Sequence, residues 1–250
     1  MDLMFLGCGA ADYDWSNYGQ EGILGSTVSL LNGHILLDCG PTAAASMERF
    51  GVSAENITAI VNTHNHSDHL NPEQVKLVAG NRRPDFYGSP QACELVKDFC
   101  TVHPLTFGDE FVIGNSSFLA LPSNHMVEDI REETFNYLIT SGGKTLLYAL
   151  DTAWMLTKAR KLIGKTHIDA IVWDATMSEP DDWRIFEHSD PVMFANIRRV
   201  LKKTGNIDDQ VKIYFDHRAL TLWPQDIESQ EAIASRENVN LAHEGETVII

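Results

Sequence analysis

The sequence predicts an α/β protein built of two mixed β-sheets with helices outside. Two observations carry this prediction. Short apolar, β-branched runs alternate with amphipathic stretches, and a pattern of hairpins followed by strand–helix alternation begins again at about residue 110. Two sheets packed face to face satisfy this pattern, although the periodicity alone also allows other α/β arrangements.

The first half of the chain contains a hairpin and several short helices. Asn32-Gly33 is a strong signal for a hairpin turn. Pro41 and Pro72 are suited to begin helices, which Gly51 and Gly80 would end. The expected elements are strands at 3–6, 26–31 and 34–37, a helix at 41–50, a strand at 57–62, and helices at 72–78 and 94–99.

The second half contains two more hairpins, followed by alternating strands and helices. Gly114-Asn115 and Ser141-Gly142-Gly143 supply the turns. The expected elements are two strands within 111–121, strands at 134–140 and 144–150, a helix at 155–162, a strand at 168–173, a helix at 191–203, a strand at 211–215, a helix at 225–235 and a strand at 247–250.

The length allows one or two domains, and the lack of a Pro/Gly/Ser-rich linker, charge block or internal repeat predicts one domain spanning residues 1–250. The chain has 250 residues, 44% of them hydrophobic, and can form a stable core without disulfide bonds or structural metal ions. It contains 19 Lys and Arg against 35 Asp and Glu, a formal net charge of -16. This charge disfavours nucleic acid and anionic membranes as partners, and it favours metal cations.

The cysteines and the N-terminal residues predict a cytoplasmic protein. Cys8, Cys39, Cys93 and Cys100 include no Cys-x-x-Cys pair, which argues against a thiolate zinc site. The N-terminal residues lack the basic and apolar regions of a signal peptide, and no apolar run approaches the roughly 18 residues of a membrane span. We therefore expect reduced thiols and no membrane partner.

The strongest functional signal is the segment Thr63-His64-Asn65-His66-Ser67-Asp68-His69. Imidazole nitrogens suit zinc, iron and manganese, and a carboxylate adds charge neutralisation. The segment lies between an expected strand and an expected helix. His64 and His66 would point the same way, whereas Asp68 and His69 can face a second ion.

Three further apolar strands lead to residues that can bind metal. The runs 119–121, 146–150 and 211–215 precede His125, Asp151 and Asp216-His217, respectively. Because all three strands end in residues of ligand type, we expect these side chains to converge on one edge of the sheets. We therefore expect these residues to join the turn at 64–69.

Together these motifs resemble the metallo-β-lactamase superfamily of metallohydrolases over nearly the whole chain. The resemblance implies a four-layer αβ/βα sandwich with a dinuclear metal site at one edge. It implies that Asp38, in Leu36-Leu37-Asp38-Cys39-Gly40, supports the ligands from behind. The implied ligands are His64, His66 and His125 for one ion, Asp68, His69 and His217 for the other, and Asp151 as the bridge.

The implied cofactors are two divalent transition metal ions: zinc, manganese or iron. Two such ions about 3.5–4 Å apart lower the pKa of a shared water toward about 7. A metal-bridging hydroxide would attack an ester-type centre, and Asp68 would orient it as a catalytic residue. Because ligation needs neutral imidazole, metal affinity should fall as the histidines protonate.

Two other segments resemble the phosphodiesterase branch, which includes phosphonate-pathway cyclic phosphodiesterases and tRNA 3′-end nucleases. These are Leu6-Gly7-Cys8-Gly9-Ala10-Ala11 and the segment 168–174, which leads to Glu187-His188-Ser189-Asp190. The resemblance places His188 beside the metals, as a catalytic residue that assists phosphate binding or leaving-group protonation. The alternative is an ordinary residue at a helix N-terminus.

The chain departs from the tRNA nucleases because it lacks an extended Gly/Pro-rich arm and carries the wrong charge for a polyanion. We therefore expect a small or cyclic phosphodiester as substrate, and no nucleic acid. A lactone or thioester hydrolase shares the metal motif and stays open as the alternative, and a homodimer is compatible with the sequence. A non-enzymatic, metal-free scaffold predicts lost ligands, and none is lost. A catalytically inactive metal-binding scaffold is the alternative of a different class.

Overall fold

In the computed structural model, which describes all 250 residues, the chain divides into two compact units. Unit 1 comprises residues 1–106, 127–133 and 243–249, and unit 2 comprises residues 107–126, 134–242 and 250. Each unit contains one mixed seven-stranded sheet with its own helices. No helix combines the length and the hydropathy that a membrane span requires.

The sheet of unit 1 has the strand order β14-β1-β2-β3-β4-β5-β6. The pairs from β14 to β3 are antiparallel, and those from β3 to β6 are parallel. The carboxyl ends of β3 and β4 are therefore neighbours, and they lead to Asp38 and to the segment 62–69. The strands are β1 (Asp2–Gly7), β2 (Val28–Leu31), β3 (Ile35–Leu37), β4 (Ala59–Val61), β5 (Asp85–Gly88), β6 (Thr101–Pro104) and β14 (Thr247–Ile249).

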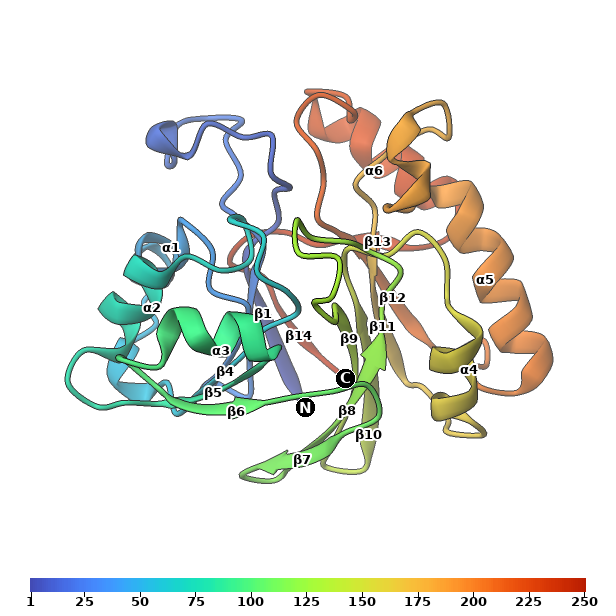
Figure 1. Cartoon of the computed structure of the whole chain (residues 1–250). Helices are drawn as coiled ribbons and strands as arrows, with labels where there is room; N and C mark the ends of the chain where they lie inside the picture. Colours follow the sequence, from blue (N-terminus) through green and yellow to red (C-terminus); the bar gives the residue numbers. More distant parts are fainter. The chain divides into compact units, whose positions relative to one another are not determined.

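Three helices pack against this sheet (Figure 1), namely α1 (Ala43–Arg49), α2 (Pro72–Ala79) and α3 (Pro90–Val96). Met47 of α1 and Val75 of α2 share one hydrophobic cluster with Leu36, Ile60 and Phe86 of the sheet. Burial of side chains of this size contributes roughly 1.5–3 kcal/mol each. This packing fixes the sheet edge that carries the turn at 62–69. Two short 3₁₀ helices, η1 (Trp15–Asn17) and η2 (Ala54–Asn56), complete the unit.

The sheet of unit 2 has the strand order β13-β12-β11-β10-β9-β8-β7. The pairs from β7 to β10 are antiparallel, and those from β10 to β13 are parallel. The carboxyl ends of β10, β11 and β12 therefore meet at one edge. The strands are β7 (Glu110–Ile113), β8 (Ser116–Pro122), β9 (Phe135–Ser141), β10 (Lys144–Ala149), β11 (Ala170–Asp174), β12 (Lys212–Asp216) and β13 (Asn240–Leu241).

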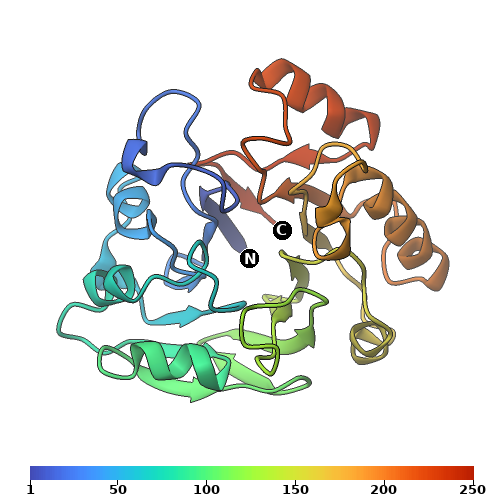
Figure 2. The ribbon, with the colours of Figure 1, turned by 45° about the horizontal axis from the view of Figure 1, so that its top comes forward.

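The helices of unit 2 lie along one side of its sheet (Figure 2); they are α4 (Thr157–Ile163), α5 (Pro191–Thr204) and α6 (Ile227–Arg236), with the 3₁₀ helix η3 (Trp183–Phe186) before α5. α5 begins where the side chain of Asp190 accepts hydrogen bonds from two backbone N–H groups, and it ends at Gly205 in the left-handed conformation. Its Phe194 ring lies 5.4 Å from Trp173 and 5.3 Å from Phe215, between centroids. This aromatic contact anchors α5 to the strands that lead to the site.

The predicted fold class, two mixed sheets flanked by helices, is confirmed. The hairpin at Asn32-Gly33 is confirmed too, because both residues have positive φ, 49° and 74°, as a type I′ turn requires. The helix predicted at 94–99 is wrong in position. It spans 90–96, because the Ser89 side chain caps the N–H of Ala92 and Pro90 occupies the first turn.

The sequence does not predict β5, β6 or β13. β5 contains Asp85 and Gly88, and β6 ends in Pro104, all residue types that strands usually avoid. Pro104 is tolerated because β6 lies at the edge of the sheet. These short strands owe their conformation to neighbours that are distant in sequence, and local patterns do not reveal such pairing.

Candidate metal centre

Three residues that follow strands have an unusual backbone conformation. Asp38 follows β3, Asp151 follows β10 and His217 follows β12, with φ of 65°, 47° and 61°. The left-handed region costs roughly 1–2 kcal/mol for a residue with a side chain. Such conformations concentrate at functional sites, where surrounding contacts impose them. The backbone therefore marks the same strand ends in both units as the sequence motifs do.

In unit 1, Asp38 is the centre of a buried hydrogen-bond network. Its Oδ1 accepts hydrogen bonds from the backbone N–H of Thr63 at 2.7 Å and from Nδ2 of Asn62 at 2.9 Å. Its Oδ2 lies 2.7 Å from Nδ1 of His69. The other ring nitrogen of His69, Nε2, lies 3.3 Å from the carboxylate of Asp68. Asp38 thus fixes both the start of the turn and the orientation of His69.

The remaining histidines of the turn lie against each other. Nε2 of His64 is 3.1 Å from Nδ1 of His66, and the ring centroids of His64 and His69 are 4.4 Å apart. His64 and His69 are buried, and His66 is half-buried. Unit 1 therefore brings together all five of its predicted site residues: Asp38, His64, His66, Asp68 and His69.

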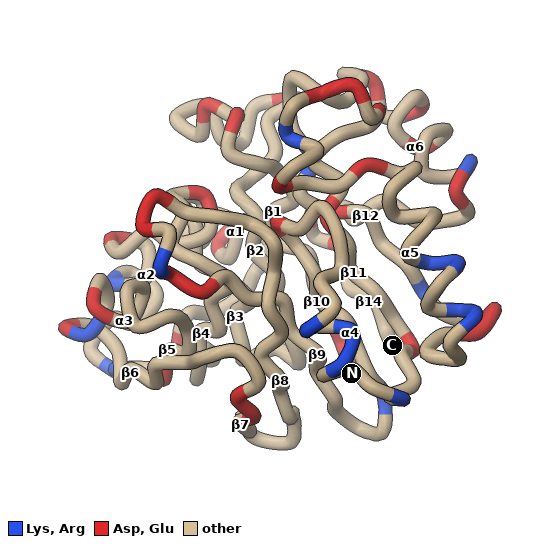
Figure 3. Tube along the Cα trace, turned by 45° about the vertical axis from the view of Figure 1, so that its right-hand side comes forward, with Lys and Arg blue, Asp and Glu red and all other residues tan.

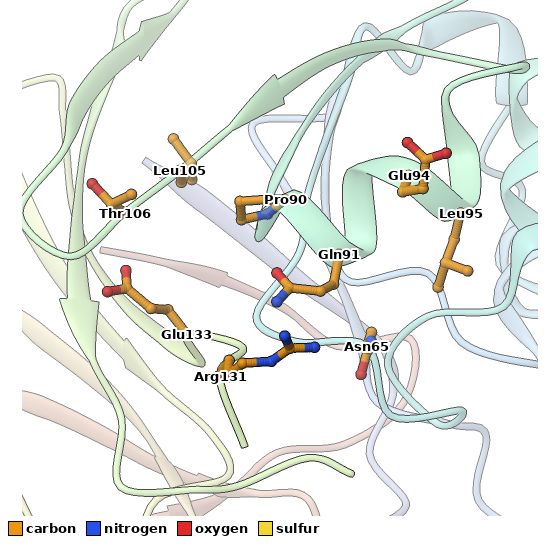
Figure 4. Close-up of a pocket in the computed structure, with 9 residues that line it drawn as sticks. All are labelled: Asn65, Pro90, Gln91, Glu94, Leu95, Leu105, Thr106, Arg131 and Glu133. Carbon is orange, nitrogen blue, oxygen red and sulfur yellow. The ribbon is translucent and has the colours of Figure 1, made fainter. Parts of the chain in front are cut away.

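The turn also contacts the segment 127–133, which belongs to the same unit. The carboxylate of Glu132 accepts hydrogen bonds from Oγ of Ser89 at 2.7 Å and from the backbone N–H of Asn65. Burial raises the pKa of Glu132, and these two bonds oppose the rise. A cavity of about 690 Å³ lies here, lined by Asn65, Gln91 and Arg131 among others (Figure 4). The histidine turn therefore borders an open space through Asn65.

In unit 2, four ligand-type side chains converge. Ligand atoms of Asp151, Asp174, His188 and His217 all lie within 4.8 Å of one another. Nδ1 of His217 is 2.8 Å from the hydroxyl of Thr176, and its Nε2 is 3.4 Å from Oδ2 of Asp151. Parallel pairing of β10, β11 and β12 places Asp151, Asp174 and His217 side by side, and the loop between η3 and α5 adds His188.

His125 approaches the same aspartate from the loop after β8. Its Nε2 lies 3.7 Å from Oδ1 of Asp151, and its Nδ1 lies 3.5 Å from the carboxylate of Glu187. The hydroxyl of Thr134 donates to the carbonyl of His125 at 2.8 Å. The carboxylate of Asp151 therefore lies between Nε2 of His125 and Nε2 of His217. Unit 2 thus brings together its predicted residues His125, Asp151, His188 and His217.

Asp174 is a site residue that sequence reasoning missed. Its Oδ2 lies 3.0 Å from Nδ1 of His188, and its Oδ1 accepts hydrogen bonds from the N–H groups of Thr176 and Ser189 at 3.0 Å. Burial alone would lower the pKa of His188, but the carboxylates of Asp174 and Asp151 outweigh it and raise the pKa. A signal was available, because the apolar run 170–173 leads directly to this aspartate.

The donor atoms fit divalent transition ions. His69 and His217 each use Nδ1 to contact an oxygen within their own unit, which leaves Nε2 beside a carboxylate. Metal-binding histidines are usually oriented in this way, with the second nitrogen held by an oxygen. Imidazole and carboxylate together suit zinc, manganese and iron. Each unit therefore presents donor atoms that suit such ions.

A family model described as the β-lactamase superfamily domain matches residues 34–210. The matched range contains every candidate residue from Asp38 to His188, and His217 lies beyond it. A search of curated proteins found no match.

Similar solved structures cover nearly all of the chain. Zn²⁺-bound PqqB from Methylobacterium extorquens has a TM-score of 0.75 and 16% identity, with 100% of both chains covered. A diphosphatase of the PhnP family has a TM-score of 0.71 and 19% identity, covering 99% of this chain and 96% of its own. The short form of human tRNase Z has a TM-score of 0.72 and 19% identity, covering 100% and 99%. At these identities the likeness concerns the fold.

Proposed function

Because the chain belongs to the β-lactamase superfamily and is a hydrolytic enzyme, we propose that it is a phosphodiesterase acting on a small or cyclic phosphodiester. We also propose that the two units form the single domain of residues 1–250 expected from the sequence. Their two clusters would then contribute to one dinuclear site. We also propose a cytoplasmic setting, in which the four buried cysteines would stay reduced.

The observation that carries the proposal is the orientation of His69 and His217. In each residue Nδ1 contacts an oxygen, and Nε2 lies 3.3 Å from Asp68 or 3.4 Å from Asp151. A metal-binding histidine usually has one ring nitrogen held by an oxygen in this way, which directs the other nitrogen to the metal. The same arrangement in both units supports a pair of ions.

The proposed ligand sets follow the sequence motifs. One ion would be held by His64, His66 and His125, the other by Asp68, His69 and His217, and Asp151 would bind both. The metal would be zinc, manganese or iron, because all three accept mixed nitrogen and oxygen ligands.

When bound, two such ions supply a water of lowered pKa and stabilise negative charge on the phosphoryl oxygens. Asp68, buried beside His69, is placed to orient the attacking water. His188 would protonate the leaving oxygen, because its Nδ1 lies 3.6 Å from the carboxylate of Asp151, the proposed bridging ligand. Asp174 would keep His188 in position through its contact with Nδ1.

The exclusion of nucleic acid is part of the proposal and rests on charge. The net charge of -16 opposes binding to a phosphate backbone. Basic residues do gather on α4 and α5 of unit 2, as the blue segments of Figure 3 show. However, Lys202 of α5 pairs with Asp209, and Arg198 donates to the carbonyl of Glu237. Such residues already have acceptors within the protein, which favours a small substrate.

The test combines metal analysis with turnover. Protein purified without chelator should contain about two transition ions per chain and hydrolyse bis(4-nitrophenyl) phosphate. Asp151→Ala should abolish turnover, whereas Asp208→Ala, at an exposed aspartate of the same unit, should not. Less than one ion per chain after metal supplementation would contradict the site and favour an inactive scaffold. Hydrolysis of lactones or thioesters without diester cleavage would favour the alternative hydrolase, and cleavage of pre-tRNA would contradict the charge argument.

A further inference from the structure

Asn124 joins three loops of unit 2 that carry candidate site residues. Its Oδ1 accepts hydrogen bonds from the backbone N–H of Ala153 at 2.8 Å, from that of Trp154 at 3.2 Å and from the hydroxyl of Thr152 at 3.0 Å. Its Nδ2 donates to the carbonyl of Phe186 at 3.1 Å. One carboxamide therefore holds the loop at 151–154 to the loop at 183–188. Asn124 itself directly precedes His125.

Each of the two joined loops presents a large aromatic side chain to solvent. The exposed fraction is 47% for Trp154 and 78% for Phe186. Neither ring stacks on another ring or on a cation of unit 2, whereas the neighbouring Trp183 lies 5.3 Å from the guanidinium of Arg184. Aromatic side chains contribute much of the contact energy at binding surfaces, so two exposed ones on loops that carry candidate site residues can contact a substrate there.

These aromatic residues adjoin the candidate ligands along the chain. Trp154 lies three residues after Asp151, and Phe186 lies two residues before His188. Their backbones lie on either side of the same carboxamide, that of Asn124. A substrate whose phosphoryl group reaches Asp151 and His188 would therefore extend one of its organic arms past Trp154 and Phe186.

The charge of the loop indicates what kind of arm this would be. The segment 179–187 contains four carboxylates and one guanidinium, and that guanidinium, Arg184, is paired with Asp182. Glu187, next to Phe186, lies 3.5 Å from Nδ1 of His125. A second anionic group on the substrate would meet this negative charge, whereas an uncharged ring would gain aromatic contact.

We propose that Trp154 and Phe186 form a subsite for an uncharged aromatic arm of the phosphodiester, held at the candidate metal centre by Asn124. The inference rests on the proposed function and adds the substrate class to it. Trp154 and Phe186 determine specificity, and Asn124 is a positioning residue that acts through their loops.

The experiment compares three diesters that share the 4-nitrophenolate leaving group and differ in the other arm, which is methyl, phenyl or 4-carboxyphenyl. For the metal-loaded enzyme, kcat/KM should be highest with phenyl. Trp154→Ala and Phe186→Ala should each lower the phenyl-to-methyl ratio of kcat/KM by about 3- to 10-fold, mainly through KM, because an aromatic pair contributes about 0.5–1.5 kcal/mol. Trp154→Phe should retain most of the ratio. Ile227→Ala, at an exposed apolar residue of α6, should leave it unchanged.

Asn124 needs a matched pair of substitutions. Asn124→Asp keeps the acceptor for residues 152–154 but loses the donor to Phe186, whereas Asn124→Ala loses both. The phenyl-to-methyl ratio should fall for both variants, further for Asn124→Ala, with metal content retained. A loss of stability alone would change both substrates equally.

The outcomes separate this proposal from the proposed function. If the enzyme cleaves the phenyl and methyl diesters and neither aromatic substitution changes their ratio, the aromatic subsite is wrong and the phosphodiesterase stands. If the 4-carboxyphenyl diester is the best substrate, the charge argument is wrong and the subsite fails. If no diester is cleaved while two ions are bound, the proposed function fails and the subsite fails with it.

Discussion

The two units supply similar ligands by different routes. In unit 1 the candidate ligands occupy one turn, His64–His69, and Asp38 orders that turn from the neighbouring strand. In unit 2 the candidates are spread from His125 to His217, and they meet at a sheet edge where several strands end and to which the loop between η3 and α5 returns. The ligands of a contiguous turn can be recognised from their spacing in the sequence. Those of a dispersed cluster can be recognised only once it is known which strands become neighbours.

This difference explains what could be predicted from the sequence. Residue types and spacing predict the site residues of the turn at 64–69. The site residues of unit 2 are predicted only from their positions at or after the ends of expected strands. Asp174 was missed although it ends β11, because its contact with His188 depends on the loop that follows the strand. Asn124 was missed because its side chain bonds to backbone groups of two other loops. Hydrogen bonds to distant backbone leave no periodic pattern in the sequence.

The largest effect is expected on turnover, when the proposed proton donor of unit 2 is removed. His188→Ala should lower kcat about 100-fold or more for a diester with an alkyl leaving group, because general acid catalysis contributes about 10²–10⁴-fold, and much less for bis(4-nitrophenyl) phosphate, whose 4-nitrophenolate needs little protonation to leave. The metal content should stay at the wild-type level, since the proposed ligands do not include His188. His167→Ala, at an exposed histidine of the same unit, serves as the control. Wild-type turnover in His188→Ala would assign His188 a structural role.

Thiol labelling and tryptophan emission can test whether the units behave as one domain. All four cysteines lie in unit 1, and the buried Trp173 and Trp223 lie in unit 2. Burial raises the pKa of Cys93 and Cys100 from 9.0 to about 11, so their thiolate fraction at pH 8 falls about 100-fold. The native protein should therefore react slowly with a thiol reagent, and faster as pH rises toward 11.

In urea, the exposure of these thiols and the change in tryptophan emission should share one midpoint if the units form one domain. A Trp15→Phe background removes the tryptophan of unit 1 from the emission signal. Two separate midpoints would show that each unit unfolds independently and would contradict the single domain of residues 1–250.

A matched pair of carboxylate substitutions compares how the two clusters are supported. Asp38→Asn should lower zinc affinity about 10- to 100-fold, because Asp38 orients His69, a proposed ligand. Asp174→Asn should affect turnover more than affinity, because its closest imidazole is His188. Competition with a chelator measures affinity, and diester hydrolysis at saturating zinc measures turnover. Equal losses of affinity in both variants would show that Asp174 supports the ions as directly as Asp38 does.

The smallest expected effect concerns the backbone of unit 2. Asp151 has φ of 47°, a backbone conformation that is less favourable for a residue with a Cβ than for glycine. Asp151→Gly and Asp151→Ala both remove the carboxylate, so they differ chiefly in whether the left-handed conformation is accessible. The free energy of unfolding in urea should be about 1 kcal/mol higher for Gly than for Ala. Equal stabilities would show that the strand end relaxes once the carboxylate is lost, and hence that contacts of the carboxylate impose the conformation. A more stable Gly variant would instead place the constraint in the backbone of β10 and the loop after it, independent of the chemistry that Asp151 performs.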